Sequence, residues 1–391
     1  MSLSLYVHIP FCLKRCVYCD FVSGLYDPAR ADAYIDALKS ELSNIPNEKP
    51  LSTLFIGGGT PTVLSTDVLT GLIKHVFNRF RFTEDYEATI EANPGTVDKD
   101  KLKALRAAGI NRSSSGIQSF NDEELAFLGR IHNREGAVRA VNLAKEAGFE
   151  NIGIDLIYGI PGQGIESWKT TLEMALKLKP KHISTYELTV EKGTLLYKYI
   201  NNPSLFLPLD KGRIGGVTLP SEDNIIEMYE YTINSLTSEG YIHYEISNFS
   251  MPDYQCKHNL NYWDRGEYYG AGLGAHSFIN GKRFYNTDNL YEYLKLISED
   301  KTPVKESEII TEDMALSEAL FLGLRKTEGI KVEAFSKRYK KNILSHYQKE
   351  IPDLQGAGLI EVASSSCSYE TALKLTRRGL ILSNEVFLKF I

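Results

Sequence analysis

The sequence predicts an α/β protein: a partial, six-unit TIM-like barrel followed by a small helical, winged-helix-like C-terminal domain. From residue 3 to about 187, short β-rich runs alternate with amphipathic helical runs. Strict alternation of this kind predicts parallel strands joined by right-handed crossovers. Eight such units would complete a TIM barrel, so the six found here predict an open one. After about residue 300 the pattern is mostly helical and ends in a short strand pair, which predicts a separate small domain.

The individual elements of the barrel follow from hydrophobic periodicity. Strands are expected in short β-rich runs, at Leu3–Ile9, Thr53–Ile56, Tyr86–Glu91, Arg112–Ile117, Asn151–Ile157 and His182–Glu187. The run Arg112-Ser-Ser-Ser-Gly116 is more polar than the apolar strand that we expect there. Helices are expected where apolar residues recur at helical spacing, at 29–46, 66–80, 98–108, 121–147 and 165–178. These elements make up the first of three expected parts, which span residues 1–190, 191–300 and 301–391.

The middle part has a different pattern. Residues 196–220 are rich in Pro, Gly and Asn, which predicts a long loop or short excursions. A helix over about 222–238 follows, with Ser221 as its N-cap. The segment 254–269 is polar and aromatic, and Asn280-Gly281 between two aromatic-containing runs predicts a two-residue hairpin.

The C-terminal part is expected to be mostly helical, with Leu359–Val362 and Ala372–Leu375 flanking a Ser-rich turn. Helices followed by a small hairpin predict a winged-helix-like fold. Residues 331–378 hold nine Lys or Arg against five Asp or Glu, which is too modest and scattered for a phosphate-binding face. A lid over the barrel mouth is the role that we expect for this domain.

Composition excludes several classes of protein. The chain has 391 residues, is 43% hydrophobic, and carries 44 Lys and Arg against 50 Asp and Glu. This mildly acidic balance argues against a general nucleic-acid binder. No apolar run is long enough for a membrane span, and MSLSLYVHIPF lacks the pattern of a secretory signal. Five cysteines cannot form a disulfide framework in a chain of this length, so a cytoplasmic protein is expected.

Three of the cysteines crowd into residues 12–19, directly after the first expected strand. Loops at this end of the strands carry the active sites of α/β barrels. The spacing of Cys12, Cys16 and Cys19 allows three thiolates to surround one metal ion or cluster. Three ligands leave one coordination position open, whereas a structural zinc site normally closes with a fourth Cys or His. A zinc site and three unrelated thiols stay open as weaker alternatives at this point.

The pattern C-x-x-x-C-x-x-C after Tyr6-Val-His-Ile-Pro-Phe11 resembles the signature of the radical S-adenosylmethionine (SAM) enzymes. Within them, nearly the whole chain resembles the HemN/HemW group, which contains oxygen-independent coproporphyrinogen III oxidase and its relatives. The resemblance implies that the three cysteines hold a 4Fe-4S cluster whose fourth iron binds the amino and carboxylate groups of SAM. In that family, reduction of the cluster cleaves SAM to a 5′-deoxyadenosyl radical.

The resemblance also implies a set of SAM contacts, at Tyr6, Gly58, Gly59, Thr60, Glu91, Gln118, Arg130 and Asp155. The Gly-Gly-Gly-Thr-Pro-Thr run that starts at Gly57 matches the element that contacts the methionine part of SAM. Glu91 matches an acidic residue near the amino group, and Gln118, Arg130 and Asp155 match ribose and carboxylate contacts. Without the resemblance, the glycines could form a tight turn, and Glu91 and Asp155 could belong to structural ion pairs.

Two features separate the branches of the group. The oxidase carries Cys-x-Cys after the third cysteine, whereas this chain has Cys19-Asp-Phe21. The second feature, His258-Asn-Leu-Asn-Tyr-Trp263, resembles the H-N-x-x-Y-W element of the haem-chaperone branch. That element implies haem contacts by His258, Asn259, Tyr262 and Trp263. Histidine is a common axial haem ligand and aromatic rings can line a macrocycle, but a structural histidine packed under aromatic rings would give the same pattern.

These features predict a radical SAM protein of tetrapyrrole metabolism that binds SAM and haem and delivers haem to an acceptor protein. Catalysis is the second hypothesis: oxidative decarboxylation of coproporphyrinogen III, which would make the chain a coproporphyrinogen dehydrogenase-type oxidoreductase. A non-catalytic zinc protein is the remote alternative. Expected partners are SAM, haem or a porphyrinogen, a haem acceptor and an electron donor, with no nucleic acid.

Overall fold

The computed structural model describes residues 3–202, 218–364 and 370–391. Its described residues contain a 12-stranded sheet in the order β14-β13-β12-β11-β1-β4-β5-β6-β7-β8-β10-β9. The six parallel strands at its centre are β1 (Leu3–Ile9), β4 (Leu51–Gly58), β5 (Phe82–Ala92), β6 (Arg112–Gln118), β7 (Asn151–Tyr158) and β8 (His182–Glu187). All six strands predicted from the sequence are therefore present, and the partial barrel is confirmed.

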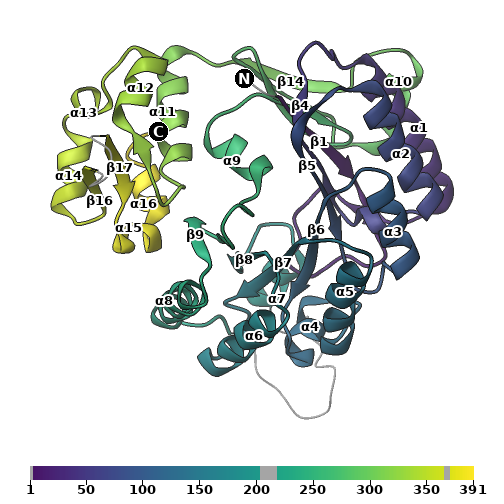
Figure 1. The fold of residues 1–391 in the computed structure, drawn as a ribbon, viewed down its shortest axis with the longest axis horizontal. Coiled ribbons are helices and arrows are strands. Elements are labelled where there is room, and N and C mark those ends of the chain that lie inside the picture. The colour runs from purple at the N-terminus through teal and green to yellow at the C-terminus, as the bar shows by residue number, and fades with distance from the viewer. Residues whose placement is uncertain (1–2, 203–217, 365–369) are drawn as a thin grey trace.

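The crossover helices lie on the outer side of the curved sheet (Figure 1). They are α1 (Pro28–Asn44), α2 (Thr66–Arg79), α3 (Lys99–Ala107), α4 (Asp122–Leu128), α5 (Arg134–Glu146) and α6 (Ile165–Lys177), and a short 3-10 helix η1 (Pro61–Val63) precedes α2. The single helix predicted over 121–147 is wrong, because Gly129 adopts a left-handed conformation that ends α4. A second helix then starts after Asn133, whose side chain accepts a hydrogen bond from the Gly136 N–H.

The middle part extends the sheet at both edges. Helix α8 (Glu222–Ser238) has the predicted Ser221 cap, and β9 (Ile242–Glu245) and β10 (Asn248–Ser250) then pair antiparallel beside β8. At the other edge, β11 (Tyr268–Ala271) pairs with β1 and β12 (His276–Ile279) follows. The Asn280-Gly281 hairpin to β13 (Lys282–Asn286) is confirmed, with positive φ at both turn residues.

Several elements were not predicted, and three of them lie where the sequence has little helix or strand signal. Helix α7 (Leu195–Asn201) occupies the start of the expected loop, whose residues 203–217 lie outside the described residues. Helix α9 (Lys257–Trp263) lies within the polar, aromatic segment, where few aliphatic residues mark a helical stripe. Strand β14 (Val304–Ile309), which follows α10 (Leu290–Ser298), is an exposed edge strand with mostly charged residues, so it carries no hydrophobic alternation.

The C-terminal domain has its own hydrophobic core. It consists of α11 (Glu312–Gly323), β15 (Ile330–Lys331), α12 (Val332–Tyr339), α13 (Ile343–His346), α14 (Glu350–Gly356), β16 (Ile360–Ser364), β17 (Thr371–Leu375), α15 (Arg377–Ile381) and α16 (Ser383–Phe387). The predicted hairpin is present as the antiparallel pair β16–β17, and the turn residues 365–369 lie outside the described residues. Helix α9 lies between this domain and the barrel (Figure 1).

Strand β6 is buried along its length although its centre is Ser113-Ser-Ser115. The Ser114 hydroxyl points to the carboxylate of Asp155 on β7, at 3.2 and 3.3 Å from its two oxygens. The Ser113 hydroxyl is buried with no hydrogen-bond partner. The strand is therefore polar at its centre, where an apolar strand was expected. The unpaired Ser113 hydroxyl costs free energy of folding, because a buried hydroxyl without a hydrogen bond is unfavourable.

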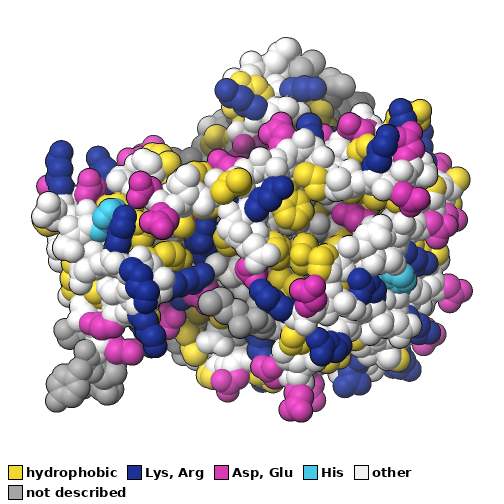
Figure 2. All heavy atoms as spheres, turned by 90° about the horizontal axis from the view of Figure 1, so that it is seen from above, with side chains coloured by type: hydrophobic (Ala, Val, Ile, Leu, Met, Phe, Trp, Pro, Cys, Tyr) yellow, Lys and Arg dark blue, Asp and Glu magenta, His cyan; other side chains and the backbone are white. Residues whose placement is uncertain are grey.

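The outer surface is mixed in charge. On the face drawn in Figure 2, basic and acidic side chains are interspersed among apolar ones. In the described part of the chain, no helix is long and apolar enough to cross a membrane.

Candidate functional site

A cavity of about 640 Å³ opens within the barrel. Each central strand, or the segment after it, contributes to its lining, so the fold gathers residues that lie far apart in the sequence. The lining includes almost every predicted site residue: Tyr6, Cys12, Cys16, Cys19, Gly58, Gly59, Thr60, Glu91, Gln118, Arg130, Asp155, His258, Asn259 and Tyr262. Trp263 is not part of it. None of residues 301–391 that the structure describes lines the cavity, and the lid role of the C-terminal domain stays a prediction.

The cysteine loop, residues 12–23, leaves β1 through a short strand pair of β2 (Phe11–Cys12) and β3 (Gly24–Leu25). Its middle is held by two backbone hydrogen bonds at Val17, whose N–H donates to Leu128 O and whose carbonyl accepts from Leu196 N. Its end is held by His8, whose Nε2 lies 2.7 Å from Val22 O. These contacts fix the course of the loop. Val17, Tyr18 and Val22 pack against the apolar cores, whereas the three cysteines line the cavity.

The three thiols of this loop are free, and each is partly exposed. Thr60 Oγ1 lies 3.6 Å from Cys12 Sγ, and Arg130 Nη1 lies 3.4 Å from Cys16 Sγ. A Cβ at position 59 would lie 3.0 Å from Cys12 Sγ, so Gly59 makes room for the sulfur. Among the described residues, no three His, Cys, Asp or Glu side chains converge closely enough to hold a single metal ion. Three free thiols on one loop fit a cluster, whose ligands bind separate irons.

The glycine run after β4 lies directly against β1 and β5. Gly58 has φ of 110°, and a Cβ there would lie 2.6 Å from the His8 ring, so both the conformation and the space require glycine. The Gly58 N–H donates a 3.1 Å hydrogen bond to Glu91 Oε2. Glycine at these positions thus lets the backbone approach both the cysteine loop and a buried carboxylate.

Glu91 and Asp155 form a buried acidic pair at the inner wall of the cavity. Burial, together with the negative charge of Asp155, raises the pKa of Glu91 to about 8. Burial also raises the pKa of Asp155, against the opposing effect of hydrogen bonds from Ser184 and Ser114 and of the positive charge of Arg112. A carboxyl group held in this way can accept hydrogen bonds from an amino group, which agrees with the predicted role of Glu91 near the SAM amino group.

Arg130 connects three walls of the cavity. Its guanidinium donates to Gly116 O on β6 at 2.7 Å, to the side chain of Asn93 and to Cys16 Sγ. Asn93 in turn donates to Thr60 Oγ1 at 2.6 Å. This network joins the cysteine loop to the glycine run, and it places a positive charge where a carboxylate of a ligand could bind. Gln118, at the end of β6, has a φ of 68°.

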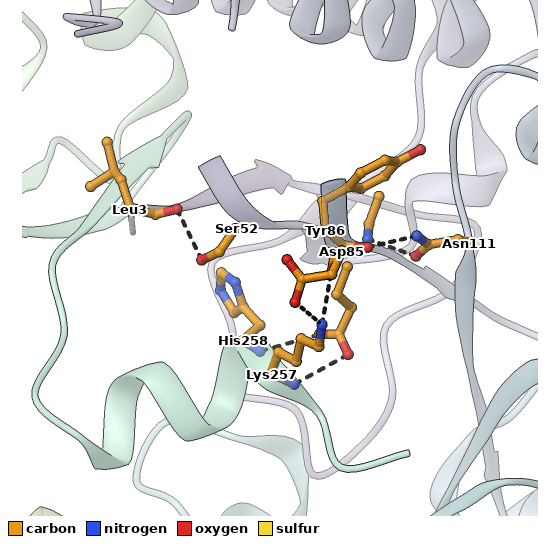
Figure 3. Close-up of polar contacts among 9 residues, drawn as sticks. Leu3, Ser52, Asp85, Tyr86, Asn111, Lys257 and His258 are labelled. Atoms are coloured by element: carbon orange, nitrogen blue, oxygen red, sulfur yellow. Dashed lines mark hydrogen bonds and ion pairs between the residues drawn. The ribbon is translucent and has the colours of Figure 1, made fainter. Parts of the chain in front are cut away.

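Helix α9 is anchored at its N-terminus on β5, where Lys257 lies against Asp85 of that strand (Figure 3). The two oxygens of Glu87 accept hydrogen bonds from the backbone N–H groups of Lys257 and His258, each at 3.1 Å. Lys257 Nζ also forms an ion pair with Asp85 at 2.9 Å. A carboxylate at a helix N-terminus is favoured by the helix dipole.

His258 is 1% exposed, and both of its ring nitrogens have partners. Nδ1 lies 2.7 Å from Thr53 Oγ1, and Nε2 lies 2.9 Å from the Tyr262 hydroxyl. Because the Thr53 hydroxyl donates to Ser4 Oγ, it accepts from Nδ1–H, so Nε2 carries the lone pair. Burial lowers the pKa of His258 to about 3. Nε2 is therefore in the form that binds metals, but an iron would have to replace the Tyr262 hydroxyl.

The C-terminal end of α9 is held by the C-terminal domain. Lys326 Nζ forms an ion pair with Asp264 at 2.6 Å, and Arg265 Nε forms one with Glu318 at 2.7 Å. The Trp263 ring lies under the Arg325 guanidinium, 4.4 Å from ring centroid to Cζ. Trp263 thus packs against the C-terminal domain, and a haem contact by it stays a prediction.

Sequence reasoning missed the buried polar residues at the inner end of the cavity. Glu87, Asn93, Arg112 and His182 line the cavity or hold its walls. A charged residue at the start of an otherwise buried strand, as at Arg112, is a signal that could have revealed one of them. The role of Glu87 depends on a contact with α9, about 170 residues later, and no local pattern shows it.

The open parallel barrel, with three cysteines on the loop after its first strand, defines the class of the protein as radical SAM. The family model Radical SAM superfamily matches residues 6–175, and that of the HemN C-terminal domain matches residues 310–382. Heme chaperone HemW of Bacillus subtilis is 37% identical over 99% of both chains, and that of Lactococcus lactis is 38% identical over 99% of this chain and 97% of the relative. The chain belongs to the HemW family.

A solved structure supports this assignment. Coproporphyrinogen III oxidase HemN from Escherichia coli, described as a radical SAM enzyme, matches with a TM-score of 0.84 and 26% identity, over 100% of this chain and 90% of that one. Membership of the radical SAM class implies a 4Fe-4S cluster and SAM as cofactors. The cavity residues fit both: three free thiols on one loop, and beside them a buried carboxyl and a buried guanidinium.

Proposed function

We propose that this protein is a haem chaperone that binds a 4Fe-4S cluster, SAM and haem, and passes haem to an acceptor protein in the cytoplasm. The observation that carries the proposal is the pairing of two features in one cavity. One is the cysteine loop, which has Phe21 after its third cysteine, and the other is helix α9 with His258. Relatives named heme chaperone match over nearly the whole chain.

The proposed cluster ligands are Cys12, Cys16 and Cys19, and the proposed SAM contacts are Tyr6, Gly58, Gly59, Thr60, Glu91, Gln118, Arg130 and Asp155. When bound, the cluster supplies an open iron and an electron. The chain's own residues then orient SAM: the Gly58–Gly59 backbone gives a close approach, Glu91 accepts from its amino group, and Arg130 pairs with its carboxylate. The Tyr6 hydroxyl donates to His8 Nδ1 at 3.0 Å, which fixes its ring beside this space.

The proposed haem contacts on α9 are His258, Asn259, Tyr262 and Trp263. The lone pair on His258 Nε2 supports axial ligation of haem iron. In this structure, that lone pair accepts a hydrogen bond from the Tyr262 hydroxyl. Ligation requires this hydrogen bond to open, and it requires space in the cavity that SAM would otherwise fill.

The second candidate function is the oxidation of coproporphyrinogen III, which the HemN-like fold favours. Phe21 argues against it, because the thiol that the oxidase carries near its cluster is replaced by a phenyl ring. The ring is 61% exposed and lines the cavity.

The experiment that tests the proposal is haem transfer. The cluster-reconstituted protein is loaded with haem under anaerobic conditions and mixed with a haem-free acceptor such as apomyoglobin. The proposal predicts that the protein binds haem saturably. It also predicts that haem passes from this protein to the acceptor faster than it does from albumin. Absence of saturable binding by a protein with an intact cluster would refute it.

A further inference from the structure

Three large apolar side chains are exposed around the mouth of the cavity. Leu13 is 51% exposed, Phe21 61% and Ile131 45%. They come from two separate segments, the cysteine loop and the turn between α4 and α5, and all three line the same cavity. Single exposed apolar residues are ordinary, but several that converge on one opening mark a binding site. We call these three residues the apolar rim.

The interior of the cavity cannot hold every ligand at once. Its volume of about 640 Å³ suits one ligand of ordinary size, and the SAM contacts lie within it. The only histidine of α9, His258, is 1% exposed and has both nitrogens bonded. We therefore expect a flat macrocycle that binds together with SAM to contact the protein further out, where side chains are exposed.

The rim has the chemistry for such a ligand. Phe21 offers an aromatic face on which a flat ring can stack, and Leu13 and Ile131 offer aliphatic contacts. Lys14 and Arg15, which follow Leu13, are exposed and also line the cavity, where they can pair with carboxylates. Acidic residues line it as well, at Asp20, Glu187 and Glu191, so the propionates of a haem are directed to the Lys14–Arg15 side.

We propose that the apolar rim is the capture site for haem: the porphyrin face stacks on Phe21 outside the SAM-filled cavity, and its propionates pair with Lys14 and Arg15. This inference rests on the proposed function as a haem chaperone, and it adds a site that lies apart from α9. It also gives Phe21 a role of its own, because a phenyl ring at this position offers a stacking face that a thiol would not.

The test is a titration of the cluster-reconstituted protein, with SAM present, by haem and by iron-free protoporphyrin IX. Phe21→Ser is expected to weaken the binding of both porphyrins at least tenfold, and Lys14→Glu with Arg15→Glu about threefold. Phe21→Trp should retain binding. Tyr291→Ser is the matched control, because Tyr291 is 79% exposed and lies outside the cavity lining, and it should bind within twofold of the wild type.

The outcomes are separable. If Phe21→Ser binds porphyrin with an affinity within twofold of that of the wild type, in a sample with full iron and sulfide content, the rim is not the haem-capture site. Unchanged haem affinity with slower transfer would also overturn this assignment and would assign the surface to the acceptor protein. If the wild type itself shows no saturable haem binding, the proposed function fails and the rim fails with it.

Discussion

The cysteine loop and helix α9 line the same cavity, but they are built in opposite ways. The loop has three partly exposed free thiols, two exposed apolar side chains and few hydrogen bonds to the rest of the chain. Helix α9 has seven residues, and it is held on β5 by Glu87 at one end and on the C-terminal domain through Asp264 and Arg265 at the other. The loop therefore offers free ligand atoms, whereas α9 offers atoms that are already bonded.

This difference indicates how each region accepts a ligand. A cluster can be added to the loop without breaking an internal contact other than the weak ones at Cys12 and Cys16. A ligand at α9 has to displace a hydrogen bond of a buried histidine, which costs about 1–3 kcal/mol unless the new bond offsets it. We therefore expect the cluster to bind tightly to the loop. A ligand is expected to bind to α9 only when the hydrogen bond between His258 and Tyr262 opens.

The largest effect is expected from the loop thiols. Replacing Cys12, Cys16 or Cys19 with Ser should abolish cluster assembly, because each supplies one of three protein ligands. Iron and sulfide analysis and the visible absorption of the reconstituted protein measure this. Cys256→Ser is the control: this buried thiol lies against Glu87 rather than on the loop, so the variant should keep its cluster. A loop variant that keeps the native absorption would contradict the assignment.

Glu91→Gln should weaken SAM binding at least tenfold and yet stabilise the fold. The raised pKa of about 8, against 4.5 for an unperturbed group, means that the folded protein holds a proton that the unfolded chain has released. The stability of the wild type should therefore fall as the pH rises from about 5 to 8, and Gln removes this dependence. At pH 8 the variant should gain at least ~1 kcal/mol in free energy of unfolding. Denaturant titrations at pH 5 and 8 measure the free energy of unfolding, and calorimetry measures SAM affinity. A variant that loses stability and binds SAM normally would show that Glu91 is structural.

A smaller effect is expected from His258→Ala, measured without SAM so that the cavity is free. Loss of the axial ligand should shift the Soret band of bound haem and weaken haem binding about fivefold. Because the pKa of His258 is lowered to about 3, the imidazole stays neutral and the wild-type spectrum should not change between pH 5 and 8. An unchanged spectrum in the variant would exclude His258 as the ligand and leave the rim as the haem contact.

The smallest effect is expected from Thr53→Val, which removes the acceptor of His258 Nδ1–H and keeps the shape of the side chain. The buried N–H then lacks a partner, which should lower the free energy of unfolding by about 1–2 kcal/mol. The Soret band should broaden as well, because the tautomer of His258 is no longer fixed. Ser52→Ala, one residue earlier on β4 with a side chain that turns to Leu3 O, is the control and should leave both observables unchanged.

The sequence predicted the parts of this picture that depend on local pattern. Five of the six strands were found because buried parallel strands form short β-rich runs, the Ser-rich β6 because it continues the alternation of strands and helices, and the cysteine loop because its spacing is local. Helix α9 was missed, since its helical state depends on Glu87 and on contacts with the C-terminal domain. The same holds for the burial of His258 and for the place of the C-terminal domain beside α9, both of which arise from packing between segments that are distant in the chain.

The most direct test of the account is anaerobic turnover by the reconstituted protein. With an intact cluster, SAM and a strong reductant, the protein is given coproporphyrinogen III, and the same sample is then titrated with haem. The account predicts no conversion to protoporphyrinogen IX and saturable haem binding, because Phe21 replaces the oxidase thiol. Many equivalents of the divinyl product per protein would contradict it and would make the chain an oxidase.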